Sequence, residues 1–355
     1  MSALVNQTGR WSVFQAKKYW YVACLSSELK KKPIQVQLWD TPIVLFRDLE
    51  GKVQALLDRC SHRNVPLSDG KCINGRVQCP YHGWEFDGEG SCRKIPALVK
   101  ELENSTRNVP SFPVRELQGH IWIFTSTESA PNHEPFLFPK MEDAGYTTIM
   151  YQADFNGSIH ATAENILDVP HTAFLHKGLF RGGVQNKIQT KLSRFSDRVE
   201  CQYIGEPRPS GLMGRILAPK GGEVEHYDRF LLPSIAQVEY GLGDRRIIVS
   251  NALSPISDFE TRLYTVVTIK LKVWPWLLRP IVLPFALKVV DQDILMLEKQ
   301  KKWIQRFGGE DYCYSDVDLL GASILRLLKK ATTEAVAIQT EVGEPDSILN
   351  GELLA

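Results

Sequence analysis

Two short cysteine–histidine pairs constrain the fold of this chain more than any other feature of its sequence. Cys60 and His62 form a Cys-x-His pair, and after sixteen residues Cys79 and His82 form a Cys-x-x-His pair. Two thiolates and two imidazoles are the donors of a [2Fe–2S] cluster in which the thiolates bind one iron and the imidazoles bind the other. A structural zinc site is the alternative, but zinc-finger histidines come as a pair after a cysteine pair. We therefore predict an iron–sulfur cluster held between two loops.

The residues around these pairs predict a small all-β domain. Short runs rich in β-branched and aromatic residues, such as WYVACL, PIVLFRD and HIWIFTS, alternate with turns that contain Gly and Asp. The polar stretch TESAPNHEPFLFPK, with three prolines, then marks a boundary. We predict an all-β domain over 18–128 and an α+β domain centred on a sheet over 129–355. The sequence leaves open whether residues 1–17 pack on the second domain.

The charge balance and the cysteine count exclude several classes of protein. The 42 Lys and Arg residues nearly cancel the 41 Asp and Glu residues, which removes the electrostatic case for nucleic-acid binding. Seven cysteines in 355 residues, after an N-terminus without signal-peptide character, favour a reducing compartment and metal ligation over disulfides. We expect a cytoplasmic protein, and we expect the five cysteines outside the two pairs to be core residues or inert.

One apolar segment does not fit a uniformly polar surface. Residues Val273–Val290 are strongly apolar over about the length of a membrane span. Three prolines, Arg279 and Lys288 interrupt the segment and argue against a regular transmembrane helix. Three interpretations remain open: an interfacial segment at the inner surface of a membrane, the lining of an apolar cavity, or a core strand followed by a core helix.

A second set of metal-binding residues occurs in the stretch ENILDVPHTAFLH, residues 164–176. His171 and His176 stand five residues apart, and Pro170 disfavours a continuous helix, so the chain can bend and let both imidazoles converge. Two histidines and one carboxylate form the facial triad of non-haem Fe(II) oxygenases, which leaves positions open for O₂. His160 is more typical of a buried, hydrogen-bonded histidine than of a ligand.

A carboxylate from a predicted helix over 286–307 completes this triad. Asp293 is the only charged residue on a mostly apolar stripe of that helix, whereas Asp291 falls beside charged residues on the wetter side. A lone buried carboxylate is unfavourable unless it is paired or bound to metal. We therefore predict Asp293 as the third iron ligand. The alternative is a core aspartate that is hydrogen-bonded to Gln300 or to the backbone.

With both sets of residues in place, the chain resembles the oxygenase component of Rieske non-haem iron oxygenases over most of its length. The matches are CSHR and CPYHGW at the two pairs, Asp-x-x-His-x-x-x-x-His at Asp168, His171 and His176, and the later segment DQDILMLEKQ. The single-chain layout resembles the α-subunit-only monooxygenases and demethylases. This resemblance implies a homotrimer and a catalytic domain of helix-grip type, with an antiparallel sheet flanked by helices.

The resemblance also implies roles for two residues beside the histidines. It implies that Asp168 is an electron-transfer bridge between His171 and a cluster histidine of the adjacent subunit, here His82. Asn165 stands one residue closer to Asp168 than in the ring-hydroxylating dioxygenases. That departure leaves the role of Asn165 open and disfavours arene dihydroxylation.

These features together predict a Rieske monooxygenase that uses O₂ to hydroxylate or oxidatively demethylate a small hydrophobic substrate. A sterol-, triterpenoid- or tetrapyrrole-like ring system suits the apolar segment, with peripheral membrane association, although similar enzymes also process aromatic ethers and N-methyl compounds. The chain has no Gly-x-Gly-x-x-Gly after a strand, so NAD(P)H would act only through a separate ferredoxin or flavin reductase. The alternatives are a Rieske electron carrier or redox sensor without mononuclear iron, and a zinc-stabilised binding module.

Overall fold

The computed structural model divides into two compact units, each with its own core. It describes residues 14–99, 107–176, 187–206, 224–270, 275–333, 336, 338 and 343–354. The first unit, here called the β unit, comprises Lys17–Leu137. The second, here called the mixed unit, comprises residues 138–354, and the described residues 14–16 group with it. Residues 1–13, for which the sequence left the packing open, lie outside the described residues.

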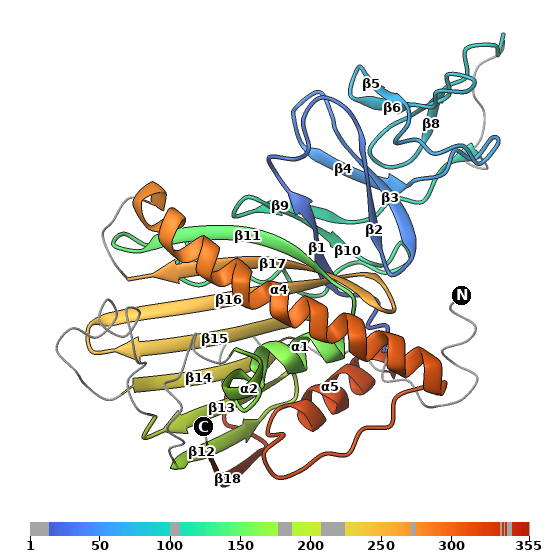
Figure 1. Cartoon of the computed structure of the whole chain (residues 1–355). Coiled ribbons are helices and arrows are strands. Elements are labelled where there is room, and N and C mark those ends of the chain that lie inside the picture. The colour runs from blue at the N-terminus through green and yellow to red at the C-terminus, as the bar shows by residue number, and fades with distance from the viewer. Residues whose placement is uncertain are drawn as a thin grey trace. The chain divides into compact units, whose positions relative to one another are not determined.

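The β unit is built of short antiparallel strands, as the alternation of apolar runs and turns predicts (Figure 1). Its described strands form three sheets, in the orders β1-β10-β9, β2-β3-β4 and β5-β6-β7-β8. Their bounds are β1 Trp20–Leu25, β2 Ile34–Leu38, β3 Thr41–Arg47, β4 Val53–Leu57, β5 Lys71–Ile73, β6 Arg76–Gln78, β7 Glu85–Phe86, β8 Cys92–Lys94, β9 Val114–Leu117 and β10 His120–Phe124.

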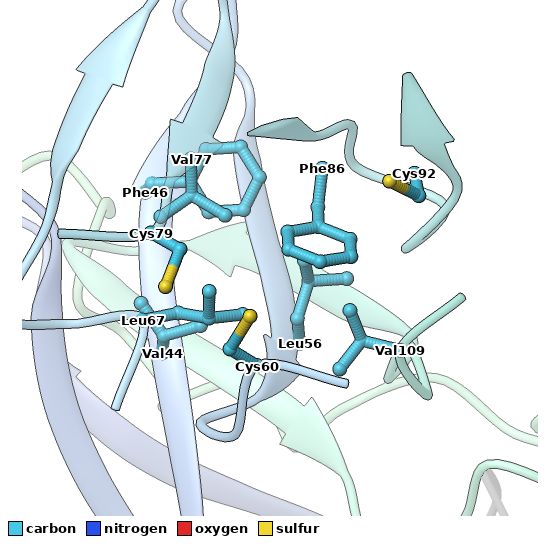
Figure 2. Close-up of a cluster of buried hydrophobic side chains, with 10 residues drawn as sticks. All are labelled: Val44, Phe46, Leu56, Cys60, Leu67, Val77, Cys79, Phe86, Cys92 and Val109. Atoms are coloured by element: carbon cyan, nitrogen blue, oxygen red, sulfur yellow. The ribbon is translucent and has the colours of Figure 1, made fainter. Parts of the chain in front are cut away.

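The two predicted cluster cysteines belong to a hydrophobic core of the β unit (Figure 2). Cys60 and Cys79 are 1 % and 3 % exposed, and they pack among Val44, Leu67 and Val77. Val44 lies on β3 and Val77 on β6, so the core joins two of the sheets. The sulfur atoms therefore lie in an apolar, nearly water-free environment.

The mixed unit is an eight-stranded antiparallel sheet with helices over one face (Figure 1). The strand order is β11-β17-β16-β15-β14-β13-β12-β18. The strand bounds are β11 Thr147–Phe155, β12 Lys187–Arg194, β13 Arg198–Ile204, β14 Val224–Leu231, β15 Ile235–Leu242, β16 Arg245–Ser257, β17 Glu260–Ile269 and β18 Ser347–Leu354. The helices are α1 Ile159–Leu167, α2 Thr172–Leu175, α4 Pro275–Phe307 and α5 Gly321–Thr333. The predicted fold class, an all-β domain plus an α+β domain with an antiparallel sheet flanked by helices, is confirmed.

Helix α4 begins eleven residues earlier than the sequence pattern predicts. The prediction placed the helix over 286–307, but the helix runs from Pro275 and includes Pro280 and Pro284. Both inner prolines are exposed, so their rings do not disturb packing, and each removes only one backbone hydrogen bond from a helix of 33 residues. The proposed core strand within Val273–Val290 is therefore wrong for residues 275–290, and residues 273 and 274 lie outside the described part of the chain.

The first half of α4 lies on the sheet. Val282 packs against Ile149, Ile247 and Val267, which come from β11, β16 and β17 and face the same side of the sheet. Other apolar side chains in this half, such as Leu277, are half exposed. None of the helices among the described residues is long and apolar enough to cross a membrane.

Candidate functional site

The two cluster loops are held in shape by backbone hydrogen bonds within each loop. Asn64 N–H donates to Cys60 O at 2.9 Å, and Gly83 N–H donates to Cys79 O at 3.1 Å. Gly83 adopts φ +72°, a left-handed conformation that favours glycine, and a Cβ there would lie 3.0 Å from the ring of Pro96. Each cysteine–histidine pair therefore lies within a tight turn.

The structure brings the four predicted cluster residues together. The centres of the His62 and His82 rings lie 4.6 Å apart. The Cys60 and Cys79 thiols are close enough to form a side-chain hydrogen bond. Nδ1 of His62 is buried and has no hydrogen-bond partner among the described residues. Trp84 stacks on the same ring at 4.7 Å. Two adjacent imidazoles, one with an orphaned and buried nitrogen, and a pair of interacting thiols form a donor set that fits a [2Fe–2S] cluster.

Burial of Cys60 disfavours the free anion of its thiol. Burial raises the pKa of the Cys60 thiol to about 11, and the neighbouring Cys79 adds to the shift. A thiolate is therefore unfavourable at neutral pH unless a cation accompanies it. Cys72 and Cys92 pack against the same core, and burial raises the pKa of each of their thiols as well.

The second predicted site comes together from two distant parts of the mixed unit. Nε2 of His171 lies 3.1 Å from Nε2 of His176, and Oδ1 of Asp293 lies 3.6 Å and 3.2 Å from these two atoms. Ligand atoms about 2.1 Å from a metal lie about 3.0 Å apart at octahedral angles and about 3.4 Å apart at tetrahedral angles. The three atoms are thus spaced as ligands of a single metal ion. Among the described residues, His171, His176 and Asp293 are the group whose geometry fits a metal site.

Local backbone geometry explains why two histidines five residues apart can converge. Helix α1 ends at Leu167, and Asp168 adopts an extended conformation before Pro170. His171 then precedes the single turn of α2, and His176 follows it. The predicted break at Pro170 is confirmed, and it lets the two imidazoles meet across α2.

Both histidines are oriented by a hydrogen bond at the ring nitrogen that faces away from the site. Nδ1 of His171 donates to the main-chain oxygen of Asp168, and Nδ1 of His176 donates to Oε1 of Gln292 at 2.8 Å. A carbonyl acceptor at Nδ1 sets the tautomer and leaves the Nε2 lone pair free for a metal ion. Gln292 was not identified from the sequence, because its only signal is its position next to Asp293.

The carboxylates make the site attractive to a cation. Burial lowers the pKa of His171, but the hydrogen bonds and charges of Asp168 and Asp293 outweigh burial and raise it to about 9. Asp293 is 8 % exposed, and its Oδ1 accepts a hydrogen bond from Nδ2 of Asn165 at 3.2 Å. A divalent ion satisfies the same charges more completely than one proton does.

Three further residues considered from the sequence take clear positions. Oδ1 of Asn165 is buried without a partner among the described residues, next to the carboxylate that its amide contacts. Oδ2 of Asp168 lies 3.4 Å from Nδ1 of His171, and its side chain is 32 % exposed. His160 is 1 % exposed, and its Nε2 faces the main-chain oxygen of Gly321 at 3.2 Å. The prediction of a buried, hydrogen-bonded histidine at His160 is confirmed.

Comparison with known families gives an independent view of these two sites. Residues 19–113 match the Rieske [2Fe-2S] domain, and residues 155–334 match the vanillate O-demethylase oxygenase C-terminal domain. The second match covers half of the chain. The chain belongs to the Rieske oxygenases with a C-terminal domain of the vanillate O-demethylase type. The resemblance inferred from the sequence motifs is confirmed.

Individual relatives include demethylases and monooxygenases. The oxygenase component of dicamba O-demethylase from Stenotrophomonas maltophilia is 38 % identical over 202 residues, which are 56 % of this chain and 59 % of the relative. The 4beta-methylsterol monooxygenase of Methylococcus capsulatus is 33 % identical over 175 residues, 47 % of this chain and 46 % of the relative. The matches thus span less than two thirds of these relatives' own length.

Solved structures share the fold over most of the chain. The crystal structure of dicamba monooxygenase bound to 3,6-dichlorosalicylic acid superimposes with a TM-score of 0.79 at 24 % identity, and covers 90 % of this chain and 98 % of that one. At this identity the likeness describes the fold of the Rieske oxygenase and leaves its substrate undefined.

Proposed function

We propose that this Rieske oxygenase is the oxygenase component of a multicomponent monooxygenase that oxidises a C–H bond of a hydrophobic substrate. The reaction class is hydroxylation or oxidative demethylation, with O₂ as co-substrate and electrons from a separate ferredoxin or flavin reductase. The supporting observation is that one chain carries both donor sets: Cys60, His62, Cys79 and His82 in the β unit, and His171, His176 and Asp293 in the mixed unit. An electron carrier or redox sensor has no use for the second set.

When bound, the cluster would supply single electrons, and the mononuclear iron would supply O₂ activation. The protein's own residues hold these centres in position. Cys60 and Cys79 present thiolates from an apolar core, and His62 and His82 present imidazoles from its rim. His171, His176 and Asp293 would hold the mononuclear iron through Nε2, Nε2 and Oδ1, a three-ligand set of the kind that is compatible with O₂ binding.

Asp168 is the residue to which we assign electron transfer between the two metal centres. Its carboxylate faces the Nδ1 side of His171, yet the side chain is 32 % exposed and can be reached from outside the unit. His82 is also exposed on the β unit. These two exposures support a head-to-tail homotrimer in which His82 of a neighbouring copy hydrogen-bonds to Asp168. Asp168 then acts as the electron-transfer bridge, and Asn165 positions the Asp293 carboxylate.

The substrate that we propose is a largely apolar molecule with a ring system. The support is the apolar character of the segment Val273–Val290, which leads into the helix that carries Asp293, and the names of two relatives, a methylsterol monooxygenase and a chlorophyllide a oxygenase. A sterol-, triterpenoid- or tetrapyrrole-like ring system fits both observations. Aromatic methyl ethers form the second class to be tried, since dicamba O-demethylase is also a relative.

The test combines iron counting with one conservative substitution. The anaerobically purified protein should contain about three iron atoms per chain, two in the cluster and one in the mononuclear site, whereas an electron carrier would contain about two. Asp168→Asn should keep this iron and the visible cluster spectrum but lose most O₂-dependent turnover with a reductase and a panel of sterols, tetrapyrroles and aromatic ethers. Asp291→Asn, on the exposed side of α4, is the matched control. Full turnover in Asp168→Asn would refute the bridging role.

A further inference from the structure

The second half of α4 carries large apolar side chains in solvent. Leu295, Met296, Trp303 and Phe307 are 56 %, 44 %, 54 % and 67 % exposed. The sequence pattern places Met296, Trp303 and Phe307 on one stripe with Asp293, Leu297 and Ile304. Asp293, Leu297 and Ile304 are buried, whereas Met296, Trp303 and Phe307 are exposed, so the buried arc of the helix is narrower than the stripe. The rings of Trp303 and Phe307 stack on one another at 5.7 Å, so together they form one apolar surface.

Basic side chains are interspersed with these apolar ones. Lys299 and Arg306 are exposed, and the guanidinium of Arg306 lies 5.3 Å from the centre of the Trp303 ring. With about 100° of rotation per residue, the four apolar and these two basic residues fall within an arc of about 120° on the outward side of the helix. Within residues 295–307 the only carboxylate, Glu298, lies outside this arc and pairs with Lys302 at 2.7 Å. The arc is therefore apolar and cationic over about 18 Å of helix.

We propose that this face of α4, the residues Leu295, Met296, Lys299, Trp303, Arg306 and Phe307, binds an anionic lipid surface. Tryptophan and phenylalanine beside lysine and arginine are the side chains that enter the headgroup region of a bilayer and contact its phosphates. The face differs from a stable contact between copies of this chain, because such interfaces are depleted in lysine at their centre.

This surface lies next to the candidate iron site on the same helix. Met296 is one turn from Asp293, and Gln292 of the same turn orients His176. A membrane-bound α4 would thus hold the iron site within one helix diameter, about 10 Å, of the lipid headgroups. A substrate dissolved in the bilayer would reach the site without crossing bulk water; that consequence, unlike the lipid binding itself, rests on the proposed function.

The experiment is sedimentation of the full-length holoprotein with lipid vesicles, which needs no turnover and so fails independently of the proposed function. Vesicles of phosphatidylcholine with phosphatidylglycerol should bind the protein, and vesicles of phosphatidylcholine alone should bind it weakly. Each cationic residue near an anionic surface contributes about 1 kcal/mol, so Lys299→Gln with Arg306→Gln should weaken binding to the anionic vesicles by roughly 30-fold. High salt should weaken the binding of the wild-type protein to anionic vesicles by a similar factor, because it screens the same charges.

The apolar half of the surface has its own variant and control. Trp303→Ser with Phe307→Ser should weaken binding by at least about tenfold to both vesicle types. Leu349→Ser, at a residue of β18 that is 48 % exposed, changes an apolar side chain elsewhere on the mixed unit and should leave binding unchanged. The visible spectrum of the cluster and the thermal melting curve show that each variant is folded.

Three results would overturn the proposal. Wild-type protein that stays in the supernatant with anionic vesicles has no lipid-binding face. Variants that bind as tightly as the wild type place the lipid contact elsewhere. Variants that change the oligomeric state in size-exclusion chromatography, or lower the rate of cluster reduction by a ferredoxin or flavin reductase, with unchanged vesicle binding, assign the face to a protein partner instead.

Discussion

The two candidate metal sites are built in opposite ways. In the β unit, each cysteine–histidine pair lies within one tight turn, and the turn's own backbone hydrogen bonds set its shape. In the mixed unit, His176 is separated in the sequence from its contacts Gln292 and Asp293 by more than a hundred residues. These residues meet only because α1, α2 and α4 lie on the same face of the sheet (Figure 1). The first site is local and the second is tertiary, and this difference predicts different responses to substitution.

Removal of a ligand from the tertiary site should have the largest selective effect. Among the described residues, Asp293→Ala removes the one carboxylate that lies near both Nε2 atoms. We expect the mononuclear iron to be lost and turnover to fall to background, while the cluster spectrum stays at full intensity. Iron analysis and visible spectroscopy on the same sample measure both. A sample that keeps three iron atoms per chain would remove Asp293 from the ligand set.

The reciprocal change tests whether the local site is independent. Cys60→Ala should abolish the visible cluster spectrum and turnover but leave about one iron per chain in the mixed unit. Cys72→Ala is the matched control, because Cys72 packs against the same core without belonging to either pair. Loss of the mononuclear iron in Cys60→Ala would show that the two units depend on each other for metal binding.

A smaller effect is expected where a side chain only orients a ligand. Gln292→Ala removes the acceptor for Nδ1 of His176 and frees that ring to rotate. Loss of such an outer contact lowers metal affinity by about 10–100-fold. Titration of the iron-depleted protein with Fe(II) under anaerobic conditions measures this. Gln292→Glu keeps an acceptor oxygen and should restore most of the affinity; if both variants bind iron like the wild type, the contact is not needed.

The smallest effect concerns a carboxyl beside the tertiary site. Burial, together with the charges of Asp318, Asp168 and Glu310, raises the pKa of Glu164 to about 7 from its ordinary value of 4.5. Between these values the folded protein keeps a proton that the unfolded chain releases, so the folded state loses stability as pH rises from about 4.5 to about 7.

Glu164→Gln removes this loss. As pH rises from 5 to 8, the unfolding free energy of the variant should increase relative to that of the wild type by roughly 1–3 kcal/mol. Urea unfolding at the two pH values measures the difference. Glu142→Gln, at an exposed position of the mixed unit, is the control and should show no such gain. Equal pH dependence in Glu164→Gln and the wild type would contradict the raised pKa.

What the sequence could predict follows the same division. The cluster residues and the short strands around them were predictable, because tight turns and alternating runs depend on neighbours in the sequence. Asp293 was predictable as a lone charge on an apolar stripe, because burial of one unpaired carboxylate is unfavourable wherever the helix packs. The outer limits of that stripe were not, since Met296, Trp303 and Phe307 are exposed.

By itself, then, the amino-acid sequence determined the candidate donor sets, the break at Pro170 and the class of each unit. Only the tertiary structure decided that Gln292 orients His176, that Asn165 contacts Asp293, that Glu164 faces three acids, and that α4 starts at Pro275. The physical reason is range: backbone conformation and periodicity act over a few residues, whereas the arc of a helix that a sheet covers depends on side chains far away in the chain.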